Sequence, residues 1–165
     1  MSLLRIARHA FQTWIGGRRR FPKRTLDRLE QAIQACERRH GAELRFVVET
    51  GLEGVRLWRG ITPRARAEEV FARLGVWDTE LDNGVLIYVL LADRDVEILA
   101  DRGFNGKVTA EEWEAVCREM ERHFARGDFE TGSLAGIEGA TRLMERHFPP
   151  GSPEPNELPD RPVLM

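Results

Sequence analysis

Apolar side chains recur every three or four residues in four segments of the chain, which is the spacing of an amphipathic helix. Thr25 and Thr62 stand where helix N-caps belong, and Thr109 forms a capping box with Glu112. Glycines follow the first three segments and offer helix ends. The sequence therefore predicts helices over residues 25–40, 63–74, 110–126 and 129–147.

Three shorter segments carry the pattern of β-strands. Residues 43–48 alternate between two faces, and residues 85–91 are continuously apolar, which is typical of a central strand covered on both sides. Residues 96–100 alternate again after a tight turn at residues 92–95, so we expect a hairpin with the central strand. A strand, a crossover helix and a second strand make a right-handed parallel unit. The predicted fold is α/β: a three-layer α/β/α sandwich on a small mixed sheet, with a parallel βαβ unit and an antiparallel hairpin.

The two ends of the chain differ from the central domain, which we expect to span residues 25–148. Residues 1–24 combine an apolar helical face with a basic run, which indicates an amphipathic N-terminal arm. Residues 149–165 hold six of the eight prolines and are predicted to be disordered. The arm is expected either to pack on its own domain or to contact an anionic membrane or an acidic partner. Its candidate contact residues are Arg5, Arg8, Arg18, Arg19 and Arg20.

Charge and cysteine content narrow the class of protein. The 25 Lys and Arg residues nearly balance the 27 Asp and Glu residues, so the overall charge gives no argument for a nucleic-acid partner. Cys36 and Cys117 fall on the apolar faces of predicted helices, where we expect them to pack in the core. No apolar run has the length of a membrane-spanning helix or a signal peptide. These features predict a soluble cytoplasmic protein, with peripheral membrane contact through the arm as an alternative.

An acidic loop precedes the predicted central strand. Asp78, Glu80 and Asp82 place carboxylates at alternate residues, and hard cations bind such oxygen clusters. The antiparallel hairpin should return Asp101 to this end of the sheet and leave Asp93 at the other end. The alternative is a solvated turn whose side chains bond their own backbone. If the loop binds Ca²⁺ or Mg²⁺, the candidate ligands are Asp78, Glu80, Asp82, Asn83, Asp101 and Asn105.

The residues around this loop and hairpin have a recognisable order. Asp82-Asn83-Gly84-Val85-Leu86-Ile87 comes first, followed by Asp93-Arg94, Gly103 and Gly127-Asp128-Phe129. In this order and spacing the chain resembles the TPM domain family over about residues 26–143. The resemblance implies the sandwich already predicted, calcium binding as in some members, and the acid phosphatase activity described for a plant member; most members have no established activity. Many relatives carry Gly-x-Gly where this chain has Asp101-Arg102-Gly103, and this departure limits which family properties can be carried over to the chain.

Two functions are compatible with these features. The first is a non-catalytic binding or accessory module that acts on a protein partner. The alternative is a metal-assisted phosphatase, in which a bound cation polarises a phosphoryl oxygen and Arg102 or Arg94 stabilises the developing charge. Hydrolysis also requires an activated nucleophile, and the sequence contains no P-loop, nucleophile elbow or HExxH motif. We therefore expect the binding module.

Overall fold

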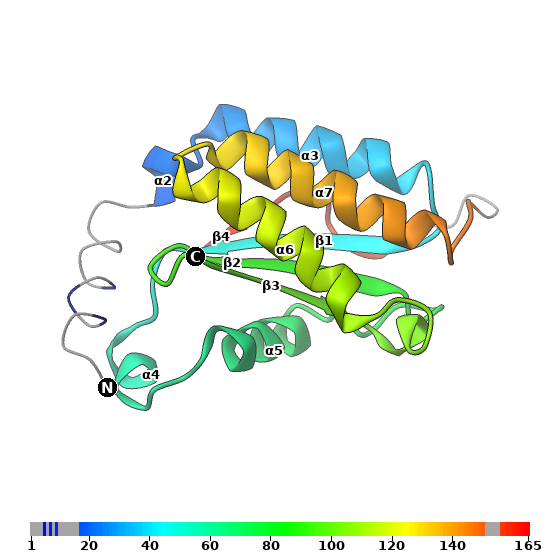
Figure 1. Cartoon of the computed structure of the whole chain (residues 1–165). Coiled ribbons are helices and arrows are strands. Elements are labelled where there is room, and N and C mark those ends of the chain that lie inside the picture. Colours follow the sequence, from blue (N-terminus) through cyan, green and yellow to red (C-terminus); the bar gives the residue numbers. More distant parts are fainter. Residues whose placement is uncertain (1–4, 6, 8, 10–16, 151–155) are drawn as a thin grey trace.

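The computed structural model describes residues 5, 7, 9, 17–150 and 156–165 (Figure 1). Its helices are α2 (Gly17–Arg20), α3 (Lys23–Glu37), α4 (Gly54–Trp58), α5 (Pro63–Arg73), α6 (Ala110–Ala125) and α7 (Phe129–Glu145). Its strands are β1 (Glu43–Glu49), β2 (Gly84–Leu90), β3 (Asp95–Ala100) and β4 (Val163–Leu164), and a 3₁₀ turn, η1 (Arg102–Phe104), follows β3. The four helices and three strands predicted for residues 25–148 are present, while α2, α4, η1 and β4 are additions.

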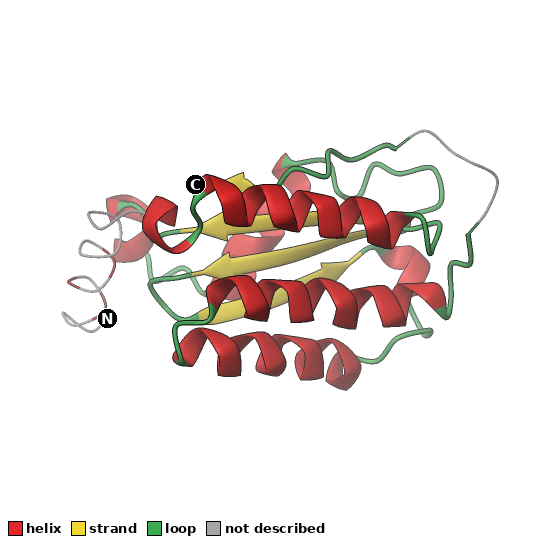
Figure 2. Ribbon diagram, turned by 90° about the horizontal axis from the view of Figure 1, so that it is seen from above, coloured by secondary structure: helices red, strands yellow, loops and turns green. Residues whose placement is uncertain are grey.

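The strands form one mixed sheet in the order β3-β2-β1-β4. β1 and β2 run parallel from the Glu43–Gly84 pair to the Glu49–Leu90 pair, and the connection between them contains α4 and α5. β3 is antiparallel to β2, and β4 is parallel to β1. The view from above shows helices lying over the strands of the sheet (Figure 2). The predicted α/β sandwich, with its parallel unit and antiparallel hairpin, is confirmed.

Helices cover the sheet on both faces (Figure 1). The face with α3, α6 and α7 holds the larger core, which includes Phe46, Ile87 and Met120. The face with α4 and α5 holds a smaller core around Leu86 and Val70. Alternate residues of β2 point into the two cores, so all seven residues of the strand are buried. β2 is therefore a central strand, as its continuous apolar sequence predicted.

The N-terminal boundary of the packed domain lies earlier than the sequence indicated. Phe21 is fully buried in the larger core and contacts the ring of Phe129, although it lies in the segment assigned to a separate arm. The helix α3 begins at Lys23, and Thr25 does not cap it. Instead the Thr25 hydroxyl donates to the Glu130 carboxylate across 2.7 Å. Thr25 was thus wrongly predicted as an N-cap, because its partner lies on another helix.

Two described side chains of the first ten residues also bond to the domain. The Arg5 guanidinium lies 2.7 Å from the Asp93 carboxylate and donates to the carbonyl of Ile61. The buried His9 accepts a hydrogen bond at Nδ1 from the amide of Leu52, so its Nε2 carries a proton and donates to Asp93 across 3.0 Å. These contacts favour the alternative in which the arm packs on its own domain.

The C-terminal tail differs most from its prediction, which was disorder over residues 149–165. From Asn156 onward the chain lies against β1, where Val163 and Leu164 pair with the strand. The amide of Met165 donates to the Val48 carbonyl, and Leu158 is buried in the smaller core. The high proline content suggested disorder, but the apolar residues between the prolines cover the outer edge of β1. Residues 151–155 lie outside the part of the chain that the structure describes.

Truncation of Leu158 tests whether the tail belongs to the fold. We expect Leu158→Ala to lower the free energy of unfolding by about 2–5 kcal/mol, because it opens a cavity in a packed core. Val55→Ala, at a side chain that is 67% exposed, should change the free energy of unfolding by less than about 0.5 kcal/mol. Urea denaturation measures both values. Equal, small effects would mean that the tail contributes nothing to stability.

Candidate functional site

The acidic loop lies at the amino end of β2, beside the turn that follows β3. The amide of Asp101 donates to the Gly84 carbonyl across 2.9 Å, and the amide of Gly103 donates to the Asp82 carbonyl across 2.9 Å. The hairpin register brings these segments together, because β3 returns antiparallel to the start of β2. Asp93 lies in the turn at the opposite end of the hairpin. The geometry predicted for Asp82, Asp101 and Asp93 is therefore correct.

An ion pair joins the two segments. The Arg102 guanidinium lies 2.6 Å from the Asp82 carboxylate, and both side chains remain partly exposed. The hydrogen bond from Arg102 lowers the pKa of Asp82, so this carboxylate stays charged. Asp82 itself has a φ of +52°, a conformation that Asp adopts more readily than most residues. A side chain at Gly103 would meet the Asp82 carbonyl at 2.4 Å, so only glycine permits this close approach.

Asp101 divides its two carboxylate oxygens between different environments. Oδ1 accepts a hydrogen bond from the amide of Arg102 across 2.7 Å and thereby caps η1. Oδ2 is buried and has no hydrogen-bond partner among the described residues. A buried carboxylate oxygen without a donor is costly, which makes Oδ2 a candidate acceptor for an external ligand. Asn105 follows directly after η1 and is exposed, and its backbone amide donates a hydrogen bond to the Arg102 carbonyl.

The other candidate ligands point elsewhere. The Asn83 side-chain amide donates to the carbonyl of Gly41, before β1, so it faces away from β3. Asp78 and Glu80 are exposed, and the Glu80 amide donates to the Glu157 carboxylate. The six candidate residues thus do not converge on one point. Across the described residues, no group of three or more His, Cys, Asp and Glu side chains is arranged to hold a metal ion.

The candidate arginines are also separated. Arg94 lies in the β2–β3 turn with a φ of +56°, at the opposite end of the hairpin from Arg102. Of the arm residues, Arg5 pairs with Asp93, Arg19 is exposed, and the Arg20 guanidinium lies 5.4 Å from the centre of the Phe129 ring. Arg8 and the side chain of Arg18 lie outside the described residues. No helix of the described chain is long and apolar enough to cross a membrane.

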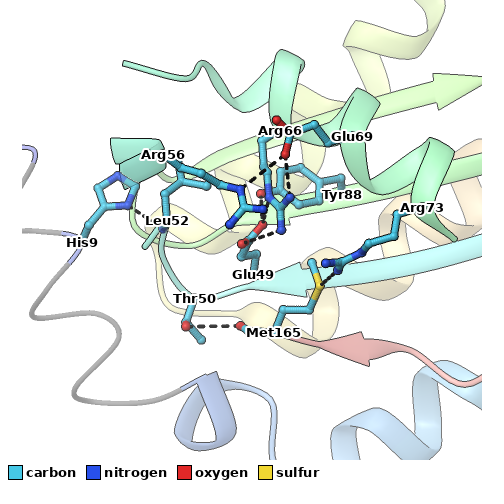
Figure 3. A network of polar contacts seen from close by, with 10 residues as sticks. All are labelled: His9, Glu49, Thr50, Leu52, Arg56, Arg66, Glu69, Arg73, Tyr88 and Met165. Carbon is cyan, nitrogen blue, oxygen red and sulfur yellow. Dashed lines mark hydrogen bonds and ion pairs between the residues drawn. The ribbon is translucent and has the colours of Figure 1, made fainter. Parts of the chain in front are cut away.

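Sequence reasoning missed a buried polar cluster at the carboxyl end of β1 (Figure 3). The Arg66 guanidinium donates twice to the Glu49 carboxylate, across 2.9 and 3.1 Å, and the Tyr88 hydroxyl donates to it across 2.6 Å. Arg66 also reaches the partly exposed Glu69 across 2.8 Å. Burial and the charge of Glu49 raise the pKa of Tyr88. Burial alone would lower the pKa of Arg66, but the hydrogen bonds that Arg66 donates to both glutamates outweigh it and raise that pKa.

This Glu49 cluster cross-links β1, β2 and α5. The side chains of Arg66 and Glu49 are only 5% and 8% exposed, and Tyr88 is fully buried. Such burial leaves no room for a substrate, so the cluster is structural. Two signals in the sequence point to it: Tyr88 is the only tyrosine of the chain, and it interrupts an aliphatic strand. A buried tyrosine hydroxyl usually finds a partner.

Removing the acid of this cluster should destabilise the domain strongly. We expect Glu49→Ala to lower the free energy of unfolding by about 3–5 kcal/mol, because it leaves a buried guanidinium without its main partner. Glu69→Ala removes the exposed end of the same network and should cost about 1 kcal/mol or less. Chemical denaturation of the two variants measures the difference. Similar losses would contradict the structural role of Glu49.

Comparisons with known proteins agree with the fold described above. The family model of the TPM domain matches residues 20–143. The solution structure of the BA42 protein from the psychrophilic bacterium Bizionia argentinensis is similar at 30% identity and a TM-score of 0.75, covering 86% of this chain and 93% of that one. The N-terminal domain of a protein from P. gingivalis has a TM-score of 0.59 at 15% identity, covering 80% and 82%, and shares the fold. No curated protein matches the chain.

Proposed function

The chain belongs to the TPM domain family, as the resemblance in its sequence predicted, and we propose that it is a non-catalytic binding module for a protein partner. The proposed contact surface is the loop from Trp77 to Asp82, called the acidic loop below. Its partner would present basic side chains around an apolar patch. The alternative, a metal-assisted phosphatase, requires in addition a nucleophile beside Asp82 and Asp101.

One observation carries this proposal: the loop exposes large apolar side chains among carboxylates. Trp77 is 52% exposed and Leu81 is 48% exposed, and the acids Asp78 and Glu80 lie between them in the sequence. Aromatic and aliphatic side chains at such positions are typical of the centre of a protein interface. Surrounding carboxylates favour a partner of opposite charge and raise the rate of association.

The loop is also held in place before any partner binds. The hydroxyl of the buried Thr79 accepts a hydrogen bond from the amide of Asn83 across 3.0 Å. Asn83 is itself buried and fixes the loop to Gly41, while Arg102 fixes it to the turn after β3. Because the backbone is anchored at these points, binding would cost little conformational entropy. This rigidity supports a recognition surface.

Trp77 and Leu81 provide the test of the binding module. The partner is first identified by cross-linking and then purified. A double variant, Trp77→Ser with Leu81→Ser, should retain the fold and bind this partner more weakly. We expect the dissociation constant to rise at least tenfold, which corresponds to a loss on the order of 1.4 kcal/mol of binding free energy. The matched control is Val55→Ser with Trp58→Ser, which removes the exposed apolar side chains of α4. Isothermal titration calorimetry compares the two. A loss of affinity only in the control would place the contact on α4.

A divalent cation at the same loop is a second candidate, favoured by Oδ2 of Asp101, to which none of the described residues donates a hydrogen bond. Ca²⁺ or Mg²⁺ would take this oxygen and compete with Arg102 for the Asp82 carboxylate. Millimolar Ca²⁺ or Mg²⁺ should then raise the melting temperature by linkage. Asp82→Asn and Asp101→Asn should abolish the rise, while Glu53→Gln, at the exposed N-cap of α4, should leave it unchanged.

The same samples separate the module from the phosphatase. We expect no hydrolysis of p-nitrophenyl phosphate above the buffer rate, with either ion present, because no activated nucleophile accompanies the carboxylates. A melting temperature indifferent to both ions would exclude the cation and leave the binding module standing. Hydrolysis that Arg102→Ala abolishes, but Arg94→Ala does not, would replace the module by the phosphatase.

A further inference from the structure

The strand β3 ends the sheet on the side opposite β4, and among the described strands only β2 pairs with it. Its hydrogen-bonding pattern follows from the register. Asp101 donates to Gly84, so alternate residues Leu99, Glu97 and Asp95 bond to β2. The backbone groups of the residues between them therefore point outward, away from the sheet. These outward residues are Val96, Ile98 and Ala100.

A groove of about 630 Å³ runs along this free edge. Its floor is β3, one wall is the α6 segment around Trp113 and Cys117, and Arg64 of α5 borders the other side. Such a groove beside an unpaired strand has the shape that an extended peptide requires, because the peptide can add to the sheet through its own backbone. The acidic loop does not line this groove, so the inference is independent of the proposed function.

Side chains of the domain occupy the edge in the free protein. The Glu121 carboxylate accepts a hydrogen bond from the amide of Val96 across 3.3 Å, and the Arg64 guanidinium donates to the carbonyl of Ile98 across 3.1 Å. Both distances are at the long end for a hydrogen bond. The Arg64 side chain is 53% exposed and can move aside without loss of core packing. Such side-chain caps protect an edge strand from unspecific pairing.

The groove carries uncompensated negative charge. Arg64 pairs with Glu97 across 3.3 Å, and Arg118 pairs with Glu114 across 3.0 Å. Asp95 and Glu121 form no ion pair within the groove, and Oδ1 of Asp95 is buried without a hydrogen-bond partner among the described residues. Burial first, and then the neighbouring carboxylates, raise the pKa of Asp95 to about 6. A cation beside Asp95 would favour the charged carboxylate and so offset both the desolvation penalty and the repulsion.

We infer that this groove binds an extended segment of a partner protein, which carries Lys or Arg side chains and adds to β3 as a further strand. Its backbone bonds to Val96 and Ile98 in place of Glu121 and Arg64. Its basic side chains reach Asp95 and the released Glu121. A second copy of this chain is disfavoured, because antiparallel pairing of two β3 strands about Val96 or Glu97 would bring Glu97 against Asp95 or Glu97 of the copy.

Backbone-amide NMR of the full chain tests the inference with synthetic peptides. The probe is an eight-residue peptide in which Thr and Val alternate with Lys. We expect saturable shifts centred on the amides of Val96, Ile98 and Ala100, and a loss of affinity as salt is raised. The same peptide with Glu in place of Lys should bind at least tenfold more weakly. N-methylation of the alternate amides that face β3 should abolish binding, whereas N-methylation of the opposite amides should preserve it.

Charge-neutral variants locate the contact. Asp95→Asn and Glu121→Gln keep the size of each side chain, and each should raise the dissociation constant of the Lys peptide by about fivefold. Glu119→Gln is the matched control, since Glu119 lies on the same helix, pairs with Arg122 and does not line the groove. Four results would each overturn the inference. Two concern affinity: equal binding of the Lys and Glu peptides, or equal affinities in all three variants. The other two are chemical shifts confined to residues 77–82 and concentration-dependent self-association through β3.

Discussion

All seven residues of β2 are buried, so both faces of this strand must be covered by other elements, and the arrangement of the domain follows from that requirement. On one side α3, α6 and α7 supply the cover, and on the other side α4 and α5 supply it (Figure 1). The connection between β1 and β2 must cross over one face of the sheet, because the two strands are parallel neighbours, and here it contains α4 and α5. The acidic loop is the last part of that crossover, where the chain leaves α5 and enters β2. The position of the loop at the amino end of β2 is therefore a consequence of parallel pairing.

The burial of β2 also removes a polar group from water, and neighbouring side chains supply its hydrogen-bond partners. Tyr88 lies in β2 on the α5 face, and its hydroxyl needs a partner away from water. Glu49 of β1 provides the acceptor, and Arg66 of α5 balances the charge of Glu49. Each of the three groups would be unfavourable alone, but together their hydrogen bonds are satisfied. The cluster thereby specifies how α5 sits on the sheet, which an apolar contact alone would define less sharply.

Periodicity was sufficient to predict the local structure, because helices and strands of this domain bury one face or both in a regular pattern. It was insufficient wherever a partner distant in sequence decides the outcome. Phe21 is in the core because α7 presents Phe129 to it, and β4 forms because β1 has a free edge. In the candidate site, antiparallel geometry predicted that Asp82 and Asp101 lie at one end of the sheet. The orientation of Asn83 toward Gly41 depends on a single long-range hydrogen bond, which no local pattern contains.

Two parts of the sheet, the amino end of β2 and the edge of β3, remain accessible because other elements cover the rest. In parallel α/β sheets, ligands usually bind beyond the carboxyl ends of the strands. Here that end of β1 is filled by the Glu49 cluster, and the backbone of Thr50 bonds to Met165 at the end of the tail. The outer edge of β1 is occupied by β4. Exposed polar groups lie at the amino end of β2 and at the edge of β3, and within the described part of the chain the buried carboxylate oxygens without a hydrogen-bond partner, from Asp101 and Asp95, lie there too.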